Sequence, residues 1–127
     1  MTSVVLDASA LLAMLNSEPG SGAVQESLPG AAISAVNLSE VISKLSERGM
    51  PEPAIRAALE GLGLEVHPFD ADAAYSTARL RTATKPYGLS LGDRTCLALG
   101  LALKAPVLTA DRTWKQLKLG VKIRSIR

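Results

Sequence analysis

The chain has 127 residues, of which 47% are hydrophobic and 20% are charged, so one domain with an apolar core is expected, and disorder or a coiled coil is not. Four aromatic residues are too few for a nucleic-acid reader built on stacked bases, and a single cysteine excludes disulfides and multi-cysteine metal sites. With one histidine as well, catalysis would have to depend on carboxylates. No apolar run is long enough to cross a bilayer and no basic segment precedes Asp7, so we expect a cytoplasmic protein without a signal peptide.

Short apolar strands alternate with helices along the whole chain. A β-branched run before Asp7 is typical of a buried strand, Pro19 and Gly20 end the first helix, and apolar residues between Leu38 and Leu45 form one helical stripe. In chain order, the pattern predicts a strand at 3–6, helices at 8–16 and 21–28, a strand at 31–34, helices at 35–48 and 52–62, a strand at 64–69, helices at 71–84 and 92–103, a strand at 106–109, a short helix at 112–117 and a last strand at 121–126.

This alternation predicts an α/β fold, because parallel strands need helical connections between them. The strands are short and almost wholly apolar, which favours burial on both faces. We therefore expect a single domain over residues 1–127, with a parallel sheet of about five short strands flanked by helices on both faces.

Charge is distributed unevenly along the chain. Residues 1–78 contain 3 basic and 10 acidic side chains, a net charge of −7, whereas residues 79–127 contain 11 basic and 2 acidic ones, a net charge of +9. A basic half-surface is expected for a partner with a phosphate backbone or for an acidic protein, although solvated surface lysines and arginines explain it equally well.

Three acidic residues, Asp7, Asp93 and Asp111, stand where strands end or helices begin, and a fourth, Glu40, lies within a predicted helix. Asp7 and Asp111 follow the first and fourth predicted strands, and ligands of open α/β sheets bind at such strand ends. Each acid also has a simpler explanation: Asp7 and Asp111 as helix N-caps, Asp93 as a partner of a helix dipole, and Glu40 as a solvated residue opposite the apolar stripe.

Taken together, the four acids indicate more than capping. Clustered carboxylates repel one another unless some are protonated or a cation neutralises them. Oxygen-only ligands suit Mg²⁺ or Mn²⁺, and such an ion lowers the pKa of bound water and stabilises charge on a phosphodiester. An acidic metal pocket with a basic rim is what a nuclease requires.

Four segments carry a resemblance to a known family. They are V-V-L-D-A-S at 4–9, S-A-V-N-L-S-E-V at 34–41, G-L-S-L-G-D-R-T-C-L-A-L-G at 88–100 and V-L-T-A-D-R-T-W at 107–114. In this order and spacing, and over essentially the whole chain, the sequence resembles PIN-domain proteins, specifically VapC-type toxin ribonucleases of type II toxin–antitoxin pairs.

The resemblance implies one PIN domain over residues 1–127, with the first and fourth strands adjacent in a parallel sheet. It matches Asp7, Glu40, Asp93 and Asp111 to the family's acidic quartet, which holds Mg²⁺ or Mn²⁺. Asp7 and Asp93 would be the firmest ligands, with Glu40 and Asp111 binding through water or orienting the attacking water. Ser9 and Thr109 match hydroxyls that support the quartet. Arg112 stands where a further acid would strengthen metal binding.

The implied function is that of a toxin acting as a Mg²⁺- or Mn²⁺-dependent endoribonuclease. The implied partners are an RNA substrate, a cognate VapB-like antitoxin and a second copy of the chain in a homodimer. Contacts to phosphate or to the antitoxin are expected from Arg94, Arg112, Arg81 and Lys85, and the first two are equally compatible with ion pairs to their neighbouring acids.

Two alternatives differ in class. A PIN-fold module that binds RNA or a protein without cutting would carry the same motifs. A phosphoacceptor signalling domain also has an acidic pocket at a sheet edge, but it would show adjacent acids after the first strand and a lysine after the last. Here Asp7 stands alone, and Arg124 and Arg127 lie at the last strand.

Overall fold

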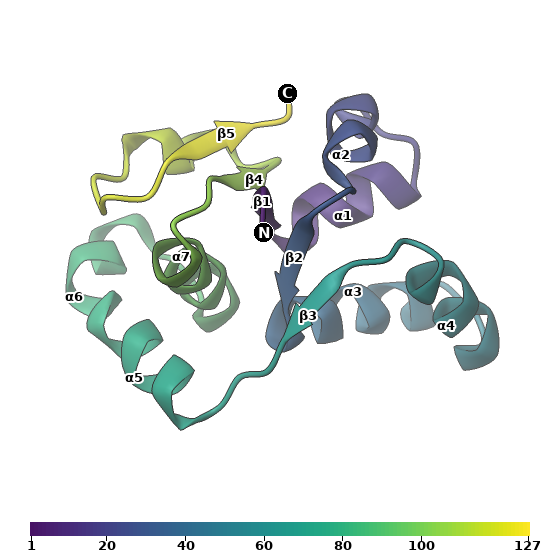
Figure 1. Ribbon diagram of the computed structural model, residues 1–127, viewed down its shortest axis with the longest axis horizontal. Coiled ribbons are helices and arrows are strands. Elements are labelled where there is room, and N and C mark those ends of the chain that lie inside the picture. Colours follow the sequence, from purple (N-terminus) through teal and green to yellow (C-terminus); the bar gives the residue numbers. More distant parts are fainter.

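A five-stranded parallel sheet forms the centre of the protein, whose computed structural model describes residues 1–127 (Figure 1). The strands are β1 (Val4–Leu6), β2 (Ala31–Ser34), β3 (Glu65–His67), β4 (Val107–Thr109) and β5 (Ile123–Ser125). The helices are α1 (Ala8–Leu15), α2 (Ser21–Ser27), α3 (Ala35–Glu47), α4 (Glu52–Glu60), α5 (Ala71–Arg79), α6 (Arg81–Thr84) and α7 (Leu91–Leu103), with 3₁₀ turns η1 (Lys85–Tyr87) and η2 (Arg112–Gln116). The predicted α/β fold is confirmed.

Most element ends lie within two residues of the expected ones, and three elements differ in kind or extent. The helix expected at 71–84 divides into α5 and α6 at Leu80, whose ψ of −6° departs from regular helix and whose side chain packs on the core. The strand expected at 64–69 covers only β3, because Pro68 has no N–H to donate to a neighbouring strand. The helix expected at 112–117 is the 3₁₀ turn η2.

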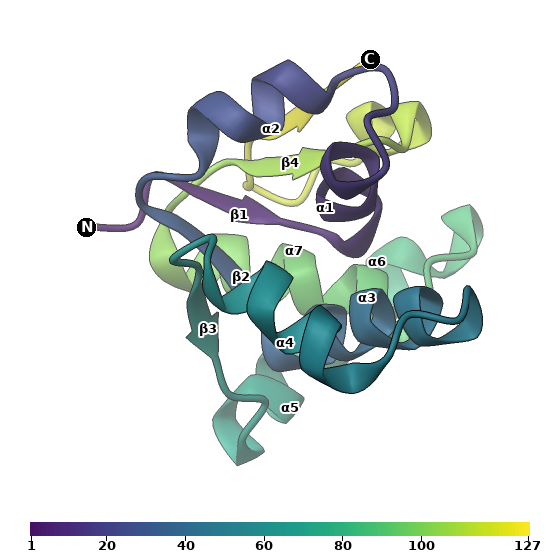
Figure 2. The same cartoon turned by 90° about the vertical axis from the view of Figure 1, so that its right-hand side faces the viewer.

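Strand order decides where the functional edge lies. The sheet runs β3-β2-β1-β4-β5, and β1 pairs with β2 on one side and with β4 on the other. The chain therefore winds outward from β1 in one direction and then returns to its other side, so the strand order reverses at β1 (Figure 2). Ligand sites of open α/β sheets lie beyond the carboxyl ends of the strands at this point. The expected pairing of the first and fourth strands is confirmed.

Alternate side chains of β1 enter two separate cores. Val4 and Leu6 pack with α1, α2, α3 and α4, while Val5 packs with α7 and η2 on the opposite face. On that second face Trp114 is 2% exposed and Cys96 is fully buried, so both belong to the core. Burial also raises the pKa of the Cys96 thiol, which keeps it neutral.

Helix α7 lies close against β4 because Gly100 has no side chain. A Cβ there would lie 2.7 Å from Cγ2 of Val107, which is shorter than real Cβ contacts. The helix buries side chains on most of its circumference. None of the helices combines the length and the hydropathy needed to cross a lipid bilayer.

We expect Leu97→Ala to lower the free energy of unfolding by about 2–5 kcal/mol, because Leu97 is 0% exposed and its loss leaves a cavity between α7 and the sheet. Leu91 lies on the same helix but is 52% exposed, so Leu91→Ala should change stability by no more than about 0.5 kcal/mol. Urea denaturation followed by circular dichroism measures both. Equal losses for the two variants would contradict the packing of α7.

Candidate active site

Four acidic side chains from separate segments line one cavity of about 220 Å³ at the carboxyl edge of the sheet. Asp7 follows β1, Glu40 lies on α3, Asp93 lies in the first turn of α7 and Asp111 follows β4. The remaining lining residues are Ala8, Ser9, Leu12, Asn37 and Trp114. A hollow of about 300 Å³ between α5 and α7 contains none of the four, so chemistry and not size identifies the candidate site.

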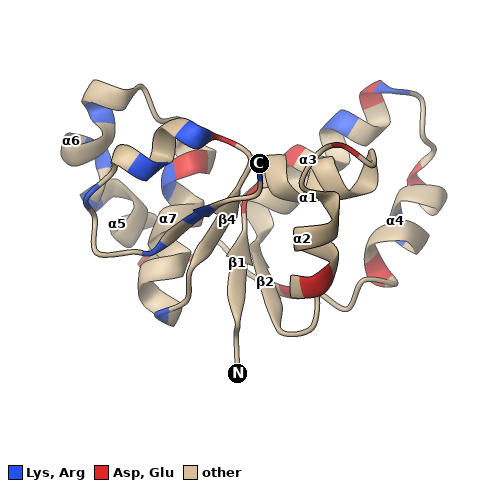
Figure 3. Ribbon diagram, turned by 90° about the horizontal axis from the view of Figure 1, so that it is seen from above, with Lys and Arg blue, Asp and Glu red and all other residues tan.

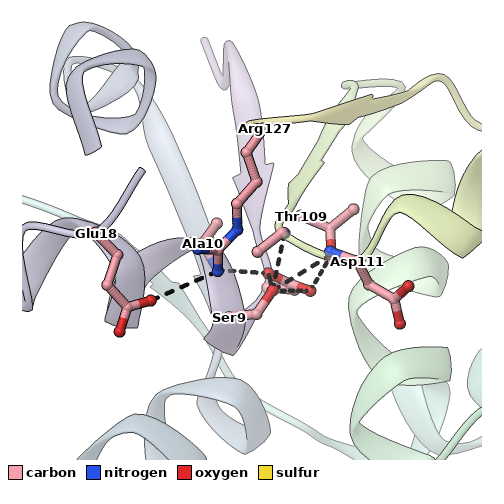
Figure 4. Close-up of polar contacts among 8 residues, drawn as sticks. Ser9, Ala10, Glu18, Thr109, Asp111 and Arg127 are labelled. Atoms are coloured by element: carbon pink, nitrogen blue, oxygen red, sulfur yellow. Dashed lines mark hydrogen bonds and ion pairs between the residues drawn. The ribbon is translucent and has the colours of Figure 1, made fainter. Parts of the chain in front are cut away.

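The Asp7 carboxylate is the most buried of the four and is 5% exposed. It caps α1, since its Oδ1 accepts a hydrogen bond from the Ala10 N–H at 2.8 Å. Ser9 Oγ donates to Oδ1 at 2.7 Å, and Thr109 Oγ1 donates to Oδ2 at 2.6 Å (Figure 4). The capping explanation is therefore correct for Asp7, and it holds the carboxylate at the cavity wall.

The two hydroxyls also connect the ends of β1 and β4. Ser9 Oγ accepts from the Ala110 N–H at 2.9 Å, and Thr109 Oγ1 accepts from the Asp111 N–H at 3.0 Å. Each hydroxyl thus donates to Asp7 and accepts from the loop that carries Asp111. Ser9 and Thr109 therefore both contact the Asp7 carboxylate directly.

Burial raises the pKa of Asp7 from 3.8 to about 6. Desolvation of the carboxylate is the main cause, and the negative charge of Asp93 adds to it. Hydrogen bonds from Thr109, Ala10 and Ser9 oppose the rise because they favour the ionised form. Asp7 is therefore ionised at neutral pH, but at a cost that a nearby cation would relieve.

Asp93 and Asp111 also combine a cap with a place at the cavity. Asp93 forms a capping box with Ser90: its Oδ2 accepts from the Ser90 N–H at 3.0 Å, and Ser90 Oγ accepts from the Asp93 N–H at 3.1 Å. Asp111 Oδ1 accepts from Thr113, at 2.9 Å from the backbone N–H and at 2.6 Å from the hydroxyl. In each residue the second carboxylate oxygen accepts no hydrogen bond from the protein.

Glu40 faces the cavity and not only solvent. Its Oε1 accepts from Asn37 Nδ2 at 2.8 Å, and its carboxylate lies against Gly92 of α7. Neither Asn37 nor Gly92 was identified from the sequence. The available signal was position: Asn37 precedes Glu40 by three residues on one helix, and Gly92 directly precedes Asp93.

The arginines beside the acids form no ion pairs with them. Arg112 Nε donates to the backbone oxygen of Arg127 at 3.2 Å, and Arg94 Nε is buried without a partner. Arg81, Lys85, Arg94 and Arg112 all lie outside the cavity lining. Of the 11 basic side chains in residues 79–127, only Arg127 forms a salt bridge, to Glu18 at 3.5 Å.

The basic side chains gather on one side of the molecule. Lysine and arginine positions occur along α5, α6, α7 and β5, whereas aspartate and glutamate positions predominate along α2, α3 and α4 (Figure 3). The charge division along the sequence is thus also a division in space, and the acidic cavity lies between its two halves.

The donor chemistry of the cavity suits a hard divalent cation, since all four charged groups are carboxylates and the nearest polar groups are hydroxyls and an amide. The side chains as they stand do not form a closed ligand cluster, because no three acidic, histidine or cysteine groups are gathered closely enough to hold a metal ion. Each carboxylate is instead directed by its own protein hydrogen bond.

Comparison with known proteins shows which family and which solved structures the chain is similar to. The family model described as "PIN domain" matches residues 4–119. A toxin–antitoxin complex from Klebsiella pneumoniae aligns with 20% identity over 98% of both chains and a TM-score of 0.78. DNA-bound VapBC from Salmonella typhimurium aligns with 20% identity over 100% of both chains and a TM-score of 0.77. VapBC-5 from Mycobacterium tuberculosis shares 26% identity over 100% of this chain and 99% of that chain, with a TM-score of 0.59. No curated protein matches the sequence.

We expect Asp7→Asn to stabilise the metal-free protein above pH 6. The pKa of Asp7 is higher in the folded state, about 6 against 3.8, so its contribution to stability is complete below pH 3.8 and is lost as the pH rises through about 6. The neutral amide avoids this loss, which amounts to at most about 3 kcal/mol. Urea denaturation at pH 4.5 and pH 8 measures the difference.

Asp70→Asn is the matched control, because Asp70 caps α5 from an exposed position and accepts from the Ala73 N–H at 3.0 Å. It should show no gain at pH 8. A stability difference between wild type and Asp7→Asn that is the same at both pH values would refute the raised pKa.

Proposed function

The chain belongs to the PIN domain family, and on that premise we propose that it is the toxin of a type II toxin–antitoxin pair and acts as a Mg²⁺- or Mn²⁺-dependent endoribonuclease. The observation that supports this proposal best is the lining of one cavity by Asp7, Glu40, Asp93 and Asp111. The toxin–antitoxin complexes whose fold the chain shares support the choice of family branch.

Asp7 and Asp93 would hold the divalent cation, with Glu40 and Asp111 binding its water or orienting the attacking water. When bound, such a cation would lower the pKa of a water molecule and stabilise the charge that develops on the phosphodiester. Ser9 and Thr109 keep Asp7 in place and ionised through their donated hydrogen bonds. Hydrolysis adds water across one P–O bond, so a free hydroxyl and a phosphate monoester leave the site.

RNA would approach over the basic side of the molecule. Arg81, Lys85, Arg94 and Arg112 have no carboxylate partner, which leaves their charges available to phosphate. A basic surface beside an acidic cavity brings a polyanion to the carboxylates without requiring the carboxylates themselves to attract it.

The proposed protein partners are a VapB-like antitoxin and a second copy of the chain. VapBC proteins among the similar structures are toxin–antitoxin systems, which supports a cognate antitoxin for this chain. An antitoxin that covers the cavity would also explain how a cell tolerates a ribonuclease of its own.

We expect Asp7→Asn and Asp93→Asn each to abolish RNA cleavage while leaving the fold intact, because the amide removes a ligand charge and keeps the shape and the cap. Cleavage of structured RNAs is measured with Mg²⁺ or Mn²⁺ and with EDTA, and circular dichroism checks the fold. Asp72→Asn, a change of an exposed acid on α5, should cleave at the wild-type rate. Undiminished cleavage by both site variants would contradict the assignment. If the wild-type protein fails to cleave RNA with Mg²⁺ and also with Mn²⁺, the non-catalytic PIN-fold module is favoured.

We expect the double change Arg81→Glu and Lys85→Glu to weaken RNA binding at least about tenfold and to reduce its dependence on salt, because two phosphate contacts are lost. Binding to an RNA hairpin is measured between about 50 and 200 mM salt, and every protein carries Asp93→Asn to prevent cleavage. Lys44→Glu with Arg48→Glu makes the same charge change at the C-terminal end of α3 and should affect binding less. If both double variants weaken RNA binding equally, Arg81 and Lys85 do not contact RNA locally. If only the Arg81 and Lys85 variant captures the antitoxin more slowly, these two residues contact the antitoxin.

A further inference from the structure

The Asn37 side chain joins α3 to the first turn of α7 at the wall of the acidic cavity. It is 1% exposed, and its Nδ2 donates both to Glu40 Oε1 at 2.8 Å and to the Gly92 carbonyl at 3.0 Å. One amide group therefore holds the Glu40 carboxylate and the backbone beside Asp93 at the same time.

The orientation of this amide is fixed by its partners. A carboxylate oxygen and a backbone carbonyl only accept hydrogen bonds, so the NH₂ group must face both of them. The amide oxygen of Asn37 is then left buried without a hydrogen-bond partner. A buried acceptor without a partner lowers stability, so the arrangement of Asn37 is not the one that stability alone would select.

Gly92 provides the space that the carboxylate occupies. A Cβ at this position would lie 2.6 Å from Glu40 Oε2 and 2.7 Å from Oε1, closer than real Cβ atoms approach. Any side chain at Gly92 would therefore displace the carboxylate. Asn37 draws the group toward α7, and the absence of a side chain at Gly92 admits it.

A neutral donor positions Glu40 without cancelling its charge. Glu40 forms no salt bridge, although lysines and arginines occur on the same half of the molecule as α7. A positively charged donor would also neutralise the carboxylate, and a neutralised carboxylate binds a cation poorly.

We propose that Asn37 and Gly92, here called the Glu40 clamp, are positioning residues that hold the Glu40 carboxylate beside α7 so that it takes part in binding a divalent cation. This inference rests on the proposed function and extends it to two residues outside the acidic quartet. Groups that orient metal ligands typically change metal affinity by 10–100-fold when they are removed.

The test is titration calorimetry of the full chain with Mn²⁺. In the wild-type background, Asn37→Ala should weaken Mn²⁺ binding by about 10–100-fold. In a Glu40→Gln background the same change should weaken Mn²⁺ binding by less than about twofold, because the charge that the amide positions is already absent. Gly92→Ala should reproduce the loss without removing a hydrogen-bond donor. Thermal unfolding of each metal-free variant measures stability separately, because a merely structural role would lower the melting temperature and leave the Mn²⁺ affinity unchanged.

Two matched controls report on packing alone. Thr77→Ala removes a polar group that is 1% exposed on α5, and Gly100→Ala adds a crowded Cβ on α7 away from the cavity. Both should keep the wild-type Mn²⁺ affinity. If Asn37→Ala does not fold, the Mn²⁺ affinities of Gly92→Ala and Gly100→Ala are compared, and a loss in Gly92→Ala alone supports the clamp.

The outcomes separate the clamp from the proposed function. The clamp alone is overturned if the wild-type protein binds Mn²⁺ and cleaves RNA while Asn37→Ala and Gly92→Ala bind Mn²⁺ as tightly as the wild type. Equal losses from Asn37→Ala in the wild-type and Glu40→Gln backgrounds also overturn it. Wild-type protein that binds no Mn²⁺ overturns the proposed function and the clamp with it.

Discussion

The carboxylate of Asp7 is taken out of water at the end of the central strand, and the arrangement of the surrounding chain follows from that burial. A buried carboxylate has to be hydrogen-bonded or neutralised, and three donors from α1 and β4 surround this one. Those donors fix the first turn of α1 and the end of β4 relative to β1. The rise in the pKa of Asp7 shows that hydrogen bonding compensates burial only in part. The remaining cost is what a cation at the cavity would offset.

Three of the four acids use one side chain both to cap a helix or turn and to line the cavity. Asp7, Asp93 and Asp111 each cap a helix or a 3₁₀ turn through one carboxylate oxygen. Capping directs each side chain to the carboxyl edge of the sheet, where the connecting segments begin, and so gathers negative charge at one place. Capping and ligand binding are therefore not competing explanations for these residues. Glu40 is different, because it lies within α3 and needs the amide of Asn37 to direct it.

The separation of charge is also a property of the topology. The chain completes α1 to α4 on one side of β1 before it reaches α5 to α7 and β5, so a difference between the first and second parts of the sequence becomes a difference between two sides of the molecule. The cavity opens at the boundary, with acidic groups inside it and unpaired basic groups beyond its rim. In the proposed ribonuclease, this arrangement would let one surface attract a polyanion and present carboxylates to it.

The sequence by itself determined the element order, the parallel α/β class and the acids at strand ends, because apolar strands, helix stops and caps are local signals that short segments carry. Tertiary structure alone decided the break at Leu80, the shortening of β3, the aim of Glu40 and the lack of ion pairs at Arg94 and Arg112. These features depend on what lies opposite each residue in space: the core beneath Leu80, the bare backbone of Gly92 facing Glu40, and the Arg127 carbonyl that receives Arg112. The contact between Asn37 and Gly92 joins positions 55 residues apart, and no local pattern encodes it because it exists only once α3 and α7 pack together.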